Sequence, residues 1–267
     1  RYGFRPNRSL GQNFLIDRNV LERLLMEAAV AKGDAVFEIG AGAGALTRRL
    51  AERARQVISV EVDERLRPLL AEALAAYDNV RLVFGDALAL DWRALLGSHP
   101  SWKLVANVPY GITAPLLLRA LRHEPPFERM VLMVQREVAE RLVASPGGKD
   151  YGALTVLAHY YANVRAVFTV SPRSFWPRPQ VWSAVVVLEP VLRPDLPPPE
   201  RFFRIVRAAF GRRRKMLRNA LGDNPYLDLG DDEVEAMLQR AGIDGDRRAE
   251  TLTLEEFARL ARSLDQR

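Results

Sequence analysis

The stretch FEIGAGAGALTRRL, residues 37–50, joins a short apolar strand to an amphipathic helix through a glycine-rich turn. Gly40, Gly42 and Gly44 stand where the chain must pass from strand to helix. Glycines at such a position permit a tight turn and let backbone N–H groups approach a ligand closely. The pattern predicts the first βα unit of a nucleotide-binding α/β fold.

Strand-like and helix-like segments alternate along most of the chain. The strand-like runs cover residues 35–40, 57–63, 80–87, 103–108, 130–135, 166–170 and 183–189. Helical stretches of about 10–15 residues separate most of them, which is typical of βαβ units in a mainly parallel sheet covered on both faces. The last two runs lie closer together and predict a hairpin at one edge of the sheet.

The composition changes at residues 190–199, PVLRPDLPPP, which contain five prolines. Proline fixes φ and cannot continue a β-ladder, so this segment is predicted to be a stiff linker. Beyond it the apolar residues follow a helical period, and Thr253 and Glu256 have the spacing of a capping box. We predict an α/β domain over residues 1–189, a linker over 190–199 and a small all-α domain over 200–267.

The composition excludes several classes of protein. There is no cysteine, and His99, His123 and His159 are widely separated, so neither thiol chemistry nor a metal site is expected. No apolar run approaches the roughly 20 residues of a membrane span, and no signal peptide is recognised, so a cytoplasmic protein is expected. The 39 basic and 33 acidic residues give a net charge of +6, which favours polyanionic partners.

Polar residues end three successive predicted strands after the glycine turn. Glu61 lies 21 residues after Gly40, where a carboxylate accepts hydrogen bonds from ribose hydroxyls. Asp86 and Asn107 end the next two strands, and all of these strand ends should open onto one crevice. The glycine turn alone also fits a nicotinamide dinucleotide site or a turn without a ligand. We find no His or Lys placed for hydride transfer.

The tetrapeptide Asn107-Val108-Pro109-Tyr110 sets an amide beside an aromatic ring. The exocyclic amine of adenine is a weak nucleophile, and acceptors aimed at its N–H bonds stabilise the positive charge that develops when it attacks a methyl sulfonium. The side-chain oxygen of Asn107 and the main-chain carbonyl of Val108 suit this role. Pro109 stiffens the turn, and Tyr110 offers a ring to an unstacked base. A capping asparagine and a packed surface tyrosine are the simpler alternatives.

Taken together, the motifs resemble the adenine dimethyltransferases of ribosomal RNA, which use S-adenosyl-L-methionine. The matching segments are LGQNFLID, EIGAGAGALT, VEVD, GDA, NVPY and FWPRPQVWS. FFRIVRAAFGRRRKMLRNAL is similar to the C-terminal domain of the KsgA-type branch, which modifies two adjacent adenosines near the 3′ end of small-subunit (16S) rRNA. The resemblance implies a Rossmann-like class I methyltransferase domain and a role in small-subunit biogenesis. We expect immature small subunits as partners, no membrane partner, and a monomer.

The resemblance also implies roles for individual residues. The expected cofactor-binding residues are Asn13, Leu15, Gly40, Gly42, Glu61, Asp86 and Asn107. Among them, Gly40 is expected beneath the methionine portion, Glu61 at the ribose and Asp86 at the adenine amino group. Asn107 is also expected to serve the target amine.

The expected catalytic residues are Asn107, Val108, Pro109, Tyr110 and Phe175, the last closing on the target base opposite Tyr110. A hydrophobic plug is the alternative for Phe175. The family usually has proline at position 41 and leucine at position 108, where this chain has Ala41 and Val108. Neither change removes a hydrogen-bonding group.

Residues 201–218 carry eight basic side chains and no acidic one. Arg204, Arg207, Arg214 and Arg218 recur at helical spacing, and apolar residues occupy the other side. A solvated helix face is the simpler explanation. However, acidic residues occur only in the sequence that flanks this segment, which favours contact with RNA phosphates. The expected RNA-binding residues are Arg204, Arg207, Arg212, Arg213, Arg214, Lys215 and Arg218.

The leading hypothesis is therefore N6,N6-dimethylation of adenosines in small-subunit rRNA. Four alternatives stay open: the antibiotic-resistance branch that acts on large-subunit rRNA, glutamine methylation of a release factor, a role chiefly in ribosome assembly, and, most remotely, NAD-dependent oxidoreduction. The release-factor enzymes usually carry Asn-Pro-Pro-Tyr, which Val108 does not match.

Overall fold

The computed structural model describes residues 6–7, 10–97, 99, 101–124, 126–212, 215–222, 224–225 and 227–264. The chain forms two compact units. The first comprises Arg1–Ala139 and Asn163–Pro190, and the second comprises Glu140–Ala162 and Val191–Arg267. Residues 140–162, which precede the proline-rich stretch and fall in the first predicted domain, thus belong to the second unit.

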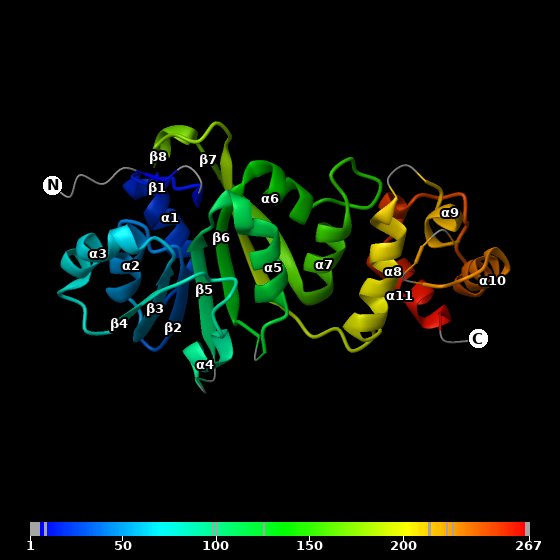
Figure 1. The fold of residues 1–267 in the computed structure, drawn as a ribbon, viewed down its shortest axis with the longest axis horizontal. Helices are drawn as coiled ribbons and strands as arrows, with labels where there is room; N and C mark the ends of the chain where they lie inside the picture. The colour runs from blue at the N-terminus through cyan, green and yellow to red at the C-terminus, as the bar shows by residue number, and fades with distance from the viewer. Residues whose placement is uncertain are drawn as a thin grey trace. The chain divides into compact units, whose positions relative to one another are not determined.

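The first unit contains a seven-stranded sheet of order β4-β3-β2-β5-β6-β9-β7 (Figure 1). Its strands are β2 (Ala35–Ile39), β3 (Gln56–Glu61), β4 (Val80–Phe84), β5 (Trp102–Asn107), β6 (Arg129–Gln135), β7 (Ala162–Val170) and β9 (Ser183–Pro190). The strands from β4 to β6 pair in parallel, and β9 runs antiparallel to β6. The predicted mainly parallel sheet is confirmed, and β9 and β7 are neighbours at one edge, as predicted.

Helices cover both faces of this sheet. They are α1 (Arg18–Ala28), α2 (Ala45–Ala51), α3 (Arg67–Leu74), α4 (Trp92–Leu96) and α5 (Thr113–Leu121), with α6 (Arg136–Leu142) after β6. Side chains alternate along a strand, so neighbouring residues of β2 pack on opposite faces. Val36 joins a cluster with residues of α1 and α2, whereas Phe37 contacts Trp92 of α4 with ring centroids 5.2 Å apart. Burial on two faces explains why the strands read as continuous apolar runs.

A small two-stranded sheet ties two distant segments together. β1 (Phe14–Leu15) pairs antiparallel with β8 (Phe175–Trp176). The described part of the chain also contains the short 3₁₀ helices η2 (Glu64–Leu66), η3 (Tyr110–Ile112), η4 (Pro172–Ser174) and η5 (Ala249–Thr251). β1 and β8 belong to the first unit and bring its N-terminal segment next to the residues that precede β9.

The second unit is a cluster of helices. It contains α7 (Ala153–Tyr161), α8 (Pro199–Gly211), α9 (Leu217–Gly222), α10 (Asp231–Ala241) and α11 (Leu254–Ser263). α8 packs against α7, α9 and α11, and α10 packs against α9 and α11. Phe202 of α8 and Phe257 of α11 are both fully buried. The expected helical C-terminal part is confirmed for the described residues, which form no strand beyond the proline-rich stretch.

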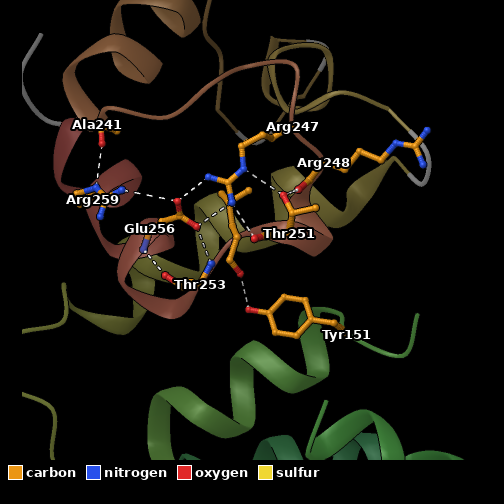
Figure 2. Close-up of polar contacts among 9 residues, drawn as sticks. Tyr151, Ala241, Arg247, Arg248, Thr251, Thr253, Glu256 and Arg259 are labelled. Carbon is orange, nitrogen blue, oxygen red and sulfur yellow. Dashed lines mark hydrogen bonds and ion pairs between the residues drawn. The ribbon is translucent and has the colours of Figure 1, made fainter. Parts of the chain in front are cut away.

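The predicted capping box at the start of α11 is confirmed, and an arginine reinforces it (Figure 2). The Thr253 hydroxyl accepts a hydrogen bond from the Glu256 N–H at 3.2 Å, and the Thr253 N–H donates to the Glu256 carboxylate at 2.9 Å. The Arg247 guanidinium donates to both oxygens of that carboxylate, at 2.5 and 3.0 Å, and to the Thr251 carbonyl at 2.8 Å. The hydrogen bonds from Arg247 lower the pKa of Glu256.

We expect Arg247→Met to lower the free energy of unfolding by about 1–3 kcal/mol, because hydrogen bonds to charged groups contribute about that much. Urea denaturation at pH 7 measures the difference. Since the pKa of Glu256 is lowered in the folded chain, its contribution is present above the unfolded pKa and is lost as the pH falls. The variant and the parent chain should therefore converge in acid. Arg248→Met, at the next residue, is the control. Equal free energies of unfolding for Arg247→Met and the parent chain at pH 7 would contradict the prediction.

Candidate active site

A cavity of about 600 Å³ opens at the carboxyl ends of β2, β3, β4 and β5 in the first unit. The seven residues expected to bind the cofactor all line it: Asn13, Leu15, Gly40, Gly42, Glu61, Asp86 and Asn107. Parallel strands present their carboxyl ends at one edge of a sheet, which is why residues far apart in sequence meet here. The structure thus places these side chains and backbone groups around a single space.

The glycine turn forms one wall of the cavity. Gly40 and Gly42 have φ values of +86° and +56°, in the left-handed region that favours glycine. A Cβ atom at Gly42 would lie 3.2 Å from the Phe14 ring, and one at Gly40 would lie 3.5 Å from the Asn107 carbonyl oxygen. Gly40 N–H donates to the Val60 carbonyl at 2.8 Å, which fixes the turn against the end of β3. Side chains at either position would strain the backbone and narrow the space.

Glu61 connects the glycine turn to the next strand. One carboxylate oxygen accepts the Gly42 N–H at 2.8 Å, and the other accepts the N–H groups of Val62 and Asp63 at 3.0 and 2.9 Å. Burial raises the pKa of Glu61, and these three hydrogen bonds oppose the shift. A carboxylate has about four acceptor sites, so about one remains for a hydroxyl group in the cavity. Glu61 therefore both holds the turn and offers an acceptor to a ligand.

Asn107 is positioned by the N-terminal segment. Its Nδ2 donates to the Asn13 carbonyl at 3.1 Å, and its Oδ1 accepts no hydrogen bond from any residue in the described ranges. The Val108 N–H donates to the Met133 carbonyl at 3.0 Å, and the Val108 side chain is buried. The Val108 carbonyl likewise has no donor among the residues that the structure describes. Two adjacent oxygen acceptors beside the cavity are thus available to an amine.

The two expected base-stacking rings lie in different environments. Tyr110 lines the cavity, and its hydroxyl is hydrogen-bonded to the Ser183 hydroxyl at 2.7 Å. Phe175 is only 1% exposed and belongs to the apolar cluster under α1. Its burial fits the alternative of a hydrophobic plug, and the role of Phe175 in closing on the target base stays a prediction. The exposed aromatic residue of β8 is Trp176.

Two residues that contribute to the cavity were not predicted from the sequence motifs. Phe14 lines it and lies against Gly42, and Gln12 donates to the Asp63 carboxylate at 2.8 Å. Both lie in the LGQNFLID segment, between or next to residues that were expected to contact the cofactor. The local sequence pattern does not show that Phe14 lies over the glycine turn. Its position depends on the pairing of β1 with β8, which are far apart in the sequence.

The expected RNA-binding residues lie in the second unit, and Arg213 and Arg214 fall outside the described residues. Arg204 and Arg207 are exposed on α8. The helix ends at Gly211 and Arg212 is extended, whereas the next helix begins at Leu217. The expected single helical stripe is therefore corrected to basic residues on two helices and the segment between them.

The remaining two members of that set differ in their contacts. Lys215 is exposed in the segment between α8 and α9. Arg218 of α9 forms an ion pair with Asp246 at 3.1 Å and a longer one with Glu235 at 3.9 Å. Both pairs are exposed, and such pairs contribute little to stability, so they leave Arg218 accessible to a phosphate. No helix in the described ranges is long and apolar enough to cross a membrane, and no described cluster of His, Asp or Glu has the geometry of a metal site.

A buried carboxyl lies under the cavity wall. Glu38 of β2 is completely buried and accepts a hydrogen bond from the Ser59 hydroxyl at 2.6 Å. Burial, helped by the nearby Glu61 carboxylate and opposed by hydrogen bonding, raises the pKa of Glu38 from 4.5 to about 7. At pH values between 4.5 and about 7, Glu38 keeps its proton in the folded chain and releases it in the unfolded chain. Stability is therefore expected to fall as the pH rises through this window.

Glu38→Gln should remove this pH dependence. The amide keeps an acceptor for Ser59 and carries no charge, so at pH 8 the variant is expected to be more stable than the parent chain by up to about 3 kcal/mol. Urea denaturation at several pH values between 5 and 8 measures both curves. Glu72→Gln, on the exposed surface of α3, serves as the control. Parallel curves for the Glu38 variant and the parent chain would contradict the burial of a titrating carboxyl.

The sheet order, the antiparallel β9 and the glycine-walled cavity define a Rossmann-like class I methyltransferase. The chain belongs to the ribosomal RNA adenine dimethylase family, whose model matches residues 3–266. The resemblance of its motifs to that family is thereby confirmed.

Relatives and solved structures agree with this assignment. A ribosomal RNA small subunit methyltransferase A from Moorella thermoacetica is 46% identical over 272 residues, covering 98% of this chain and 93% of the relative. One from Clostridium botulinum (strain Langeland) is 45% identical over 263 residues, covering 98% and 94%.

Among solved structures, a dimethyladenosine transferase from Plasmodium falciparum is similar with a TM-score of 0.81 and 27% identity, over 92% of this chain and 95% of that one. The 23S rRNA methyltransferase ErmE is similar with a TM-score of 0.70 and 32% identity, over 95% and 100%.

Proposed function

We propose that this chain transfers methyl groups from S-adenosylmethionine to the N6 amines of adenosines in small-subunit rRNA. The observation that carries the proposal is a pair of oxygen acceptors, Asn107 Oδ1 and the Val108 carbonyl, that no described residue donates to, at the edge of a cavity walled by a glycine turn. Curated relatives at 45–46% identity carry the name ribosomal RNA small subunit methyltransferase A. Their name supports the small subunit as the source of the substrate.

The residues around the cavity fit S-adenosylmethionine. The remaining acceptor site of Glu61 suits a ribose hydroxyl, and the Asp86 carboxylate at the next strand end suits an adenine amino group. Because Gly40 has no side chain, the cavity has room beside its backbone for the methionine portion. When bound, the cofactor supplies a methyl group activated on a sulfonium sulfur.

The chain's own residues then orient the amine. Asn107 Oδ1 and the Val108 carbonyl accept hydrogen bonds from the N6 amine, directing its lone pair toward the cofactor side of the cavity and stabilising positive charge as it develops. Tyr110, held by Ser183, provides a ring for an extruded base, since an adenine within a helix cannot present its amine to a cavity. No general base is required, because the two acceptors stabilise the positive charge on the methylated N6 amine until its proton is released to solvent.

Several finer features belong to the same proposal. The targets are two adjacent adenosines near the 3′ end of the small-subunit rRNA, and the enzyme acts as a monomer on immature small subunits in the cytoplasm. The basic residues of the second unit contact rRNA phosphates, with exposed Arg204 and Arg207 of α8 supporting this assignment. Phosphate contacts make binding weaken as salt concentration rises.

The test is a methyl-transfer assay with tritiated S-adenosylmethionine and immature small subunits purified from cells that lack this activity. Label recovered as N6,N6-dimethyladenosine at two adjacent positions of the small-subunit rRNA is the expected result. Absence of label from these particles would refute the proposal. The similarity to ErmE favours large-subunit rRNA as the second candidate, so large-subunit rRNA is offered in parallel under the same conditions.

A further inference from the structure

The segment between β8 and β9 is attached to the cavity at both ends. At its start, Trp176 pairs in register with Phe14, and the two rings are stacked with centroids 6.4 Å apart. At its end, the Ser183 hydroxyl is hydrogen-bonded to Tyr110 at 2.7 Å. Phe14 and Tyr110 both line the cavity. Residues 176–182 therefore run beside the cavity from its Phe14 side to its Tyr110 side.

This segment exposes two large aromatic side chains. Trp176 is 52% exposed and Trp182 is 48% exposed, whereas Trp92 and Trp102 are buried. Val181, next to Trp182, is also exposed. Large apolar side chains grouped on a surface usually mark a binding site. Neither tryptophan was assigned a role by the sequence motifs or by the proposed mechanism.

The charge around the two tryptophans indicates the kind of partner. Arg173 and Arg178 flank Trp176, are exposed, and make no ion pair with a residue in the described ranges. Residues 151–188 contain no Asp or Glu, so this positive charge is not compensated locally in the sequence. Aromatic rings with nearby arginines are the combination that binds single-stranded nucleic acid, with bases on the rings and phosphates on the guanidinium groups.

We infer that Trp176 and Trp182 form a stacking platform for unpaired rRNA bases that flank the target adenosines, with Arg173 and Arg178 on the adjoining phosphates. The platform lies outside the reaction cavity and would hold the strand while one base at a time enters it. This inference rests on the proposed function, because it takes rRNA to be the substrate, and it adds contacts that position the strand. Since Trp176 is stacked on Phe14, the platform is continuous with the cavity wall.

The test measures binding of immature small subunits to variants at positions 176 and 182. Trp176→Ala and Trp182→Ala are each expected to weaken binding about 10-fold, in line with the loss of one stacked base. Trp176→Tyr should retain most of the affinity, whereas Trp176→Leu should behave like the alanine variant. S-adenosylmethionine affinity, measured by calorimetry, should be unchanged in Trp182→Ala. Leu192→Ala, at an exposed apolar side chain of the second unit, is the control.

Chemical probing of the bound rRNA identifies what the tryptophans touch. Bases within a few nucleotides of the methylated adenosines are expected to be protected by the parent chain and to lose protection with Trp176→Ala. Unchanged binding and protection in both alanine variants would overturn the inference. Full rescue by Trp176→Leu would also overturn it, because that result indicates an apolar contact with a ribosomal protein. Failure of the parent chain to bind or methylate the particles would instead refute the proposed function.

Discussion

Asn107→Ala is expected to reduce methyl transfer by about 100-fold or more, the size of effect seen when one preorganised group that stabilises transition-state charge is removed. The variant loses Oδ1, one of the two acceptors beside the cavity. It also loses the Nδ2 hydrogen bond to the Asn13 carbonyl, which ties the N-terminal segment to the end of β5. Single-turnover transfer from labelled S-adenosylmethionine to immature small subunits measures the rate.

Two further measurements separate chemistry from binding. If Asn107 acts mainly on the amine, the rate of transfer should fall much more than the affinity for S-adenosylmethionine, which calorimetry reports. Asn219→Ala, at an exposed asparagine of α9 without a hydrogen-bond partner in the described part of the chain, is the matched control and should transfer methyl groups normally. Transfer by Asn107→Ala within about threefold of the parent chain would show that the Val108 carbonyl suffices.

The same variant tests whether assembly is the main role. An Asn107→Ala chain that no longer methylates but still binds immature subunits separates the two activities. Binding should persist, because Asn107 supplies only one contact to the target amine, while the proposed phosphate contacts lie on exposed residues such as Arg204 and Arg207.

The sheet and its site could be predicted because local pattern and topology agree. Buried parallel strands read as apolar runs, and the polar residue that ends each run must lie at the carboxyl edge. That reasoning located Glu61, Asp86 and Asn107 with no information on long-range contacts, and the structure places all three on one cavity. The capping box of α11 was predictable for the same reason, since Thr253 and Glu256 interact within one turn.

The features that the sequence leaves open depend on contacts between distant segments. Phe175 lies in an irregular, proline-rich stretch where periodicity says nothing about depth, and only the pairing of β8 with β1 turns its ring into the core. The run from 200 to 221 keeps a helical apolar period across a break after Gly211, because buried Val206 and Leu217 face the same core from two helices. Helical propensity is too weak to reveal such a break.

Glu61→Ala is expected to weaken S-adenosylmethionine binding by about 100-fold or more, because hydrogen bonds to a charged group contribute about 1.5–3 kcal/mol each. The variant removes the acceptor proposed for a ribose hydroxyl. It also leaves the Gly42 N–H without its carboxylate, so the glycine turn loses the contact that ties it to the end of β3. Calorimetric titration with the cofactor measures the affinity, and circular dichroism confirms that the variant is folded.

Glu64→Ala is the matched control, because Glu64 lies three residues further on, is exposed, and pairs only with Arg67 among the residues described. Its cofactor affinity should equal that of the parent chain. The pH dependence gives an independent check, since burial raises the pKa of Glu61 above its ordinary value of 4.5. As the pH falls, the parent chain should begin to lose affinity at a higher pH than an exposed glutamate would dictate, and Glu61→Ala should lack this loss. If the affinity of Glu61→Ala for S-adenosylmethionine stayed within twofold of that of the parent chain, the ribose would not be bound by Glu61.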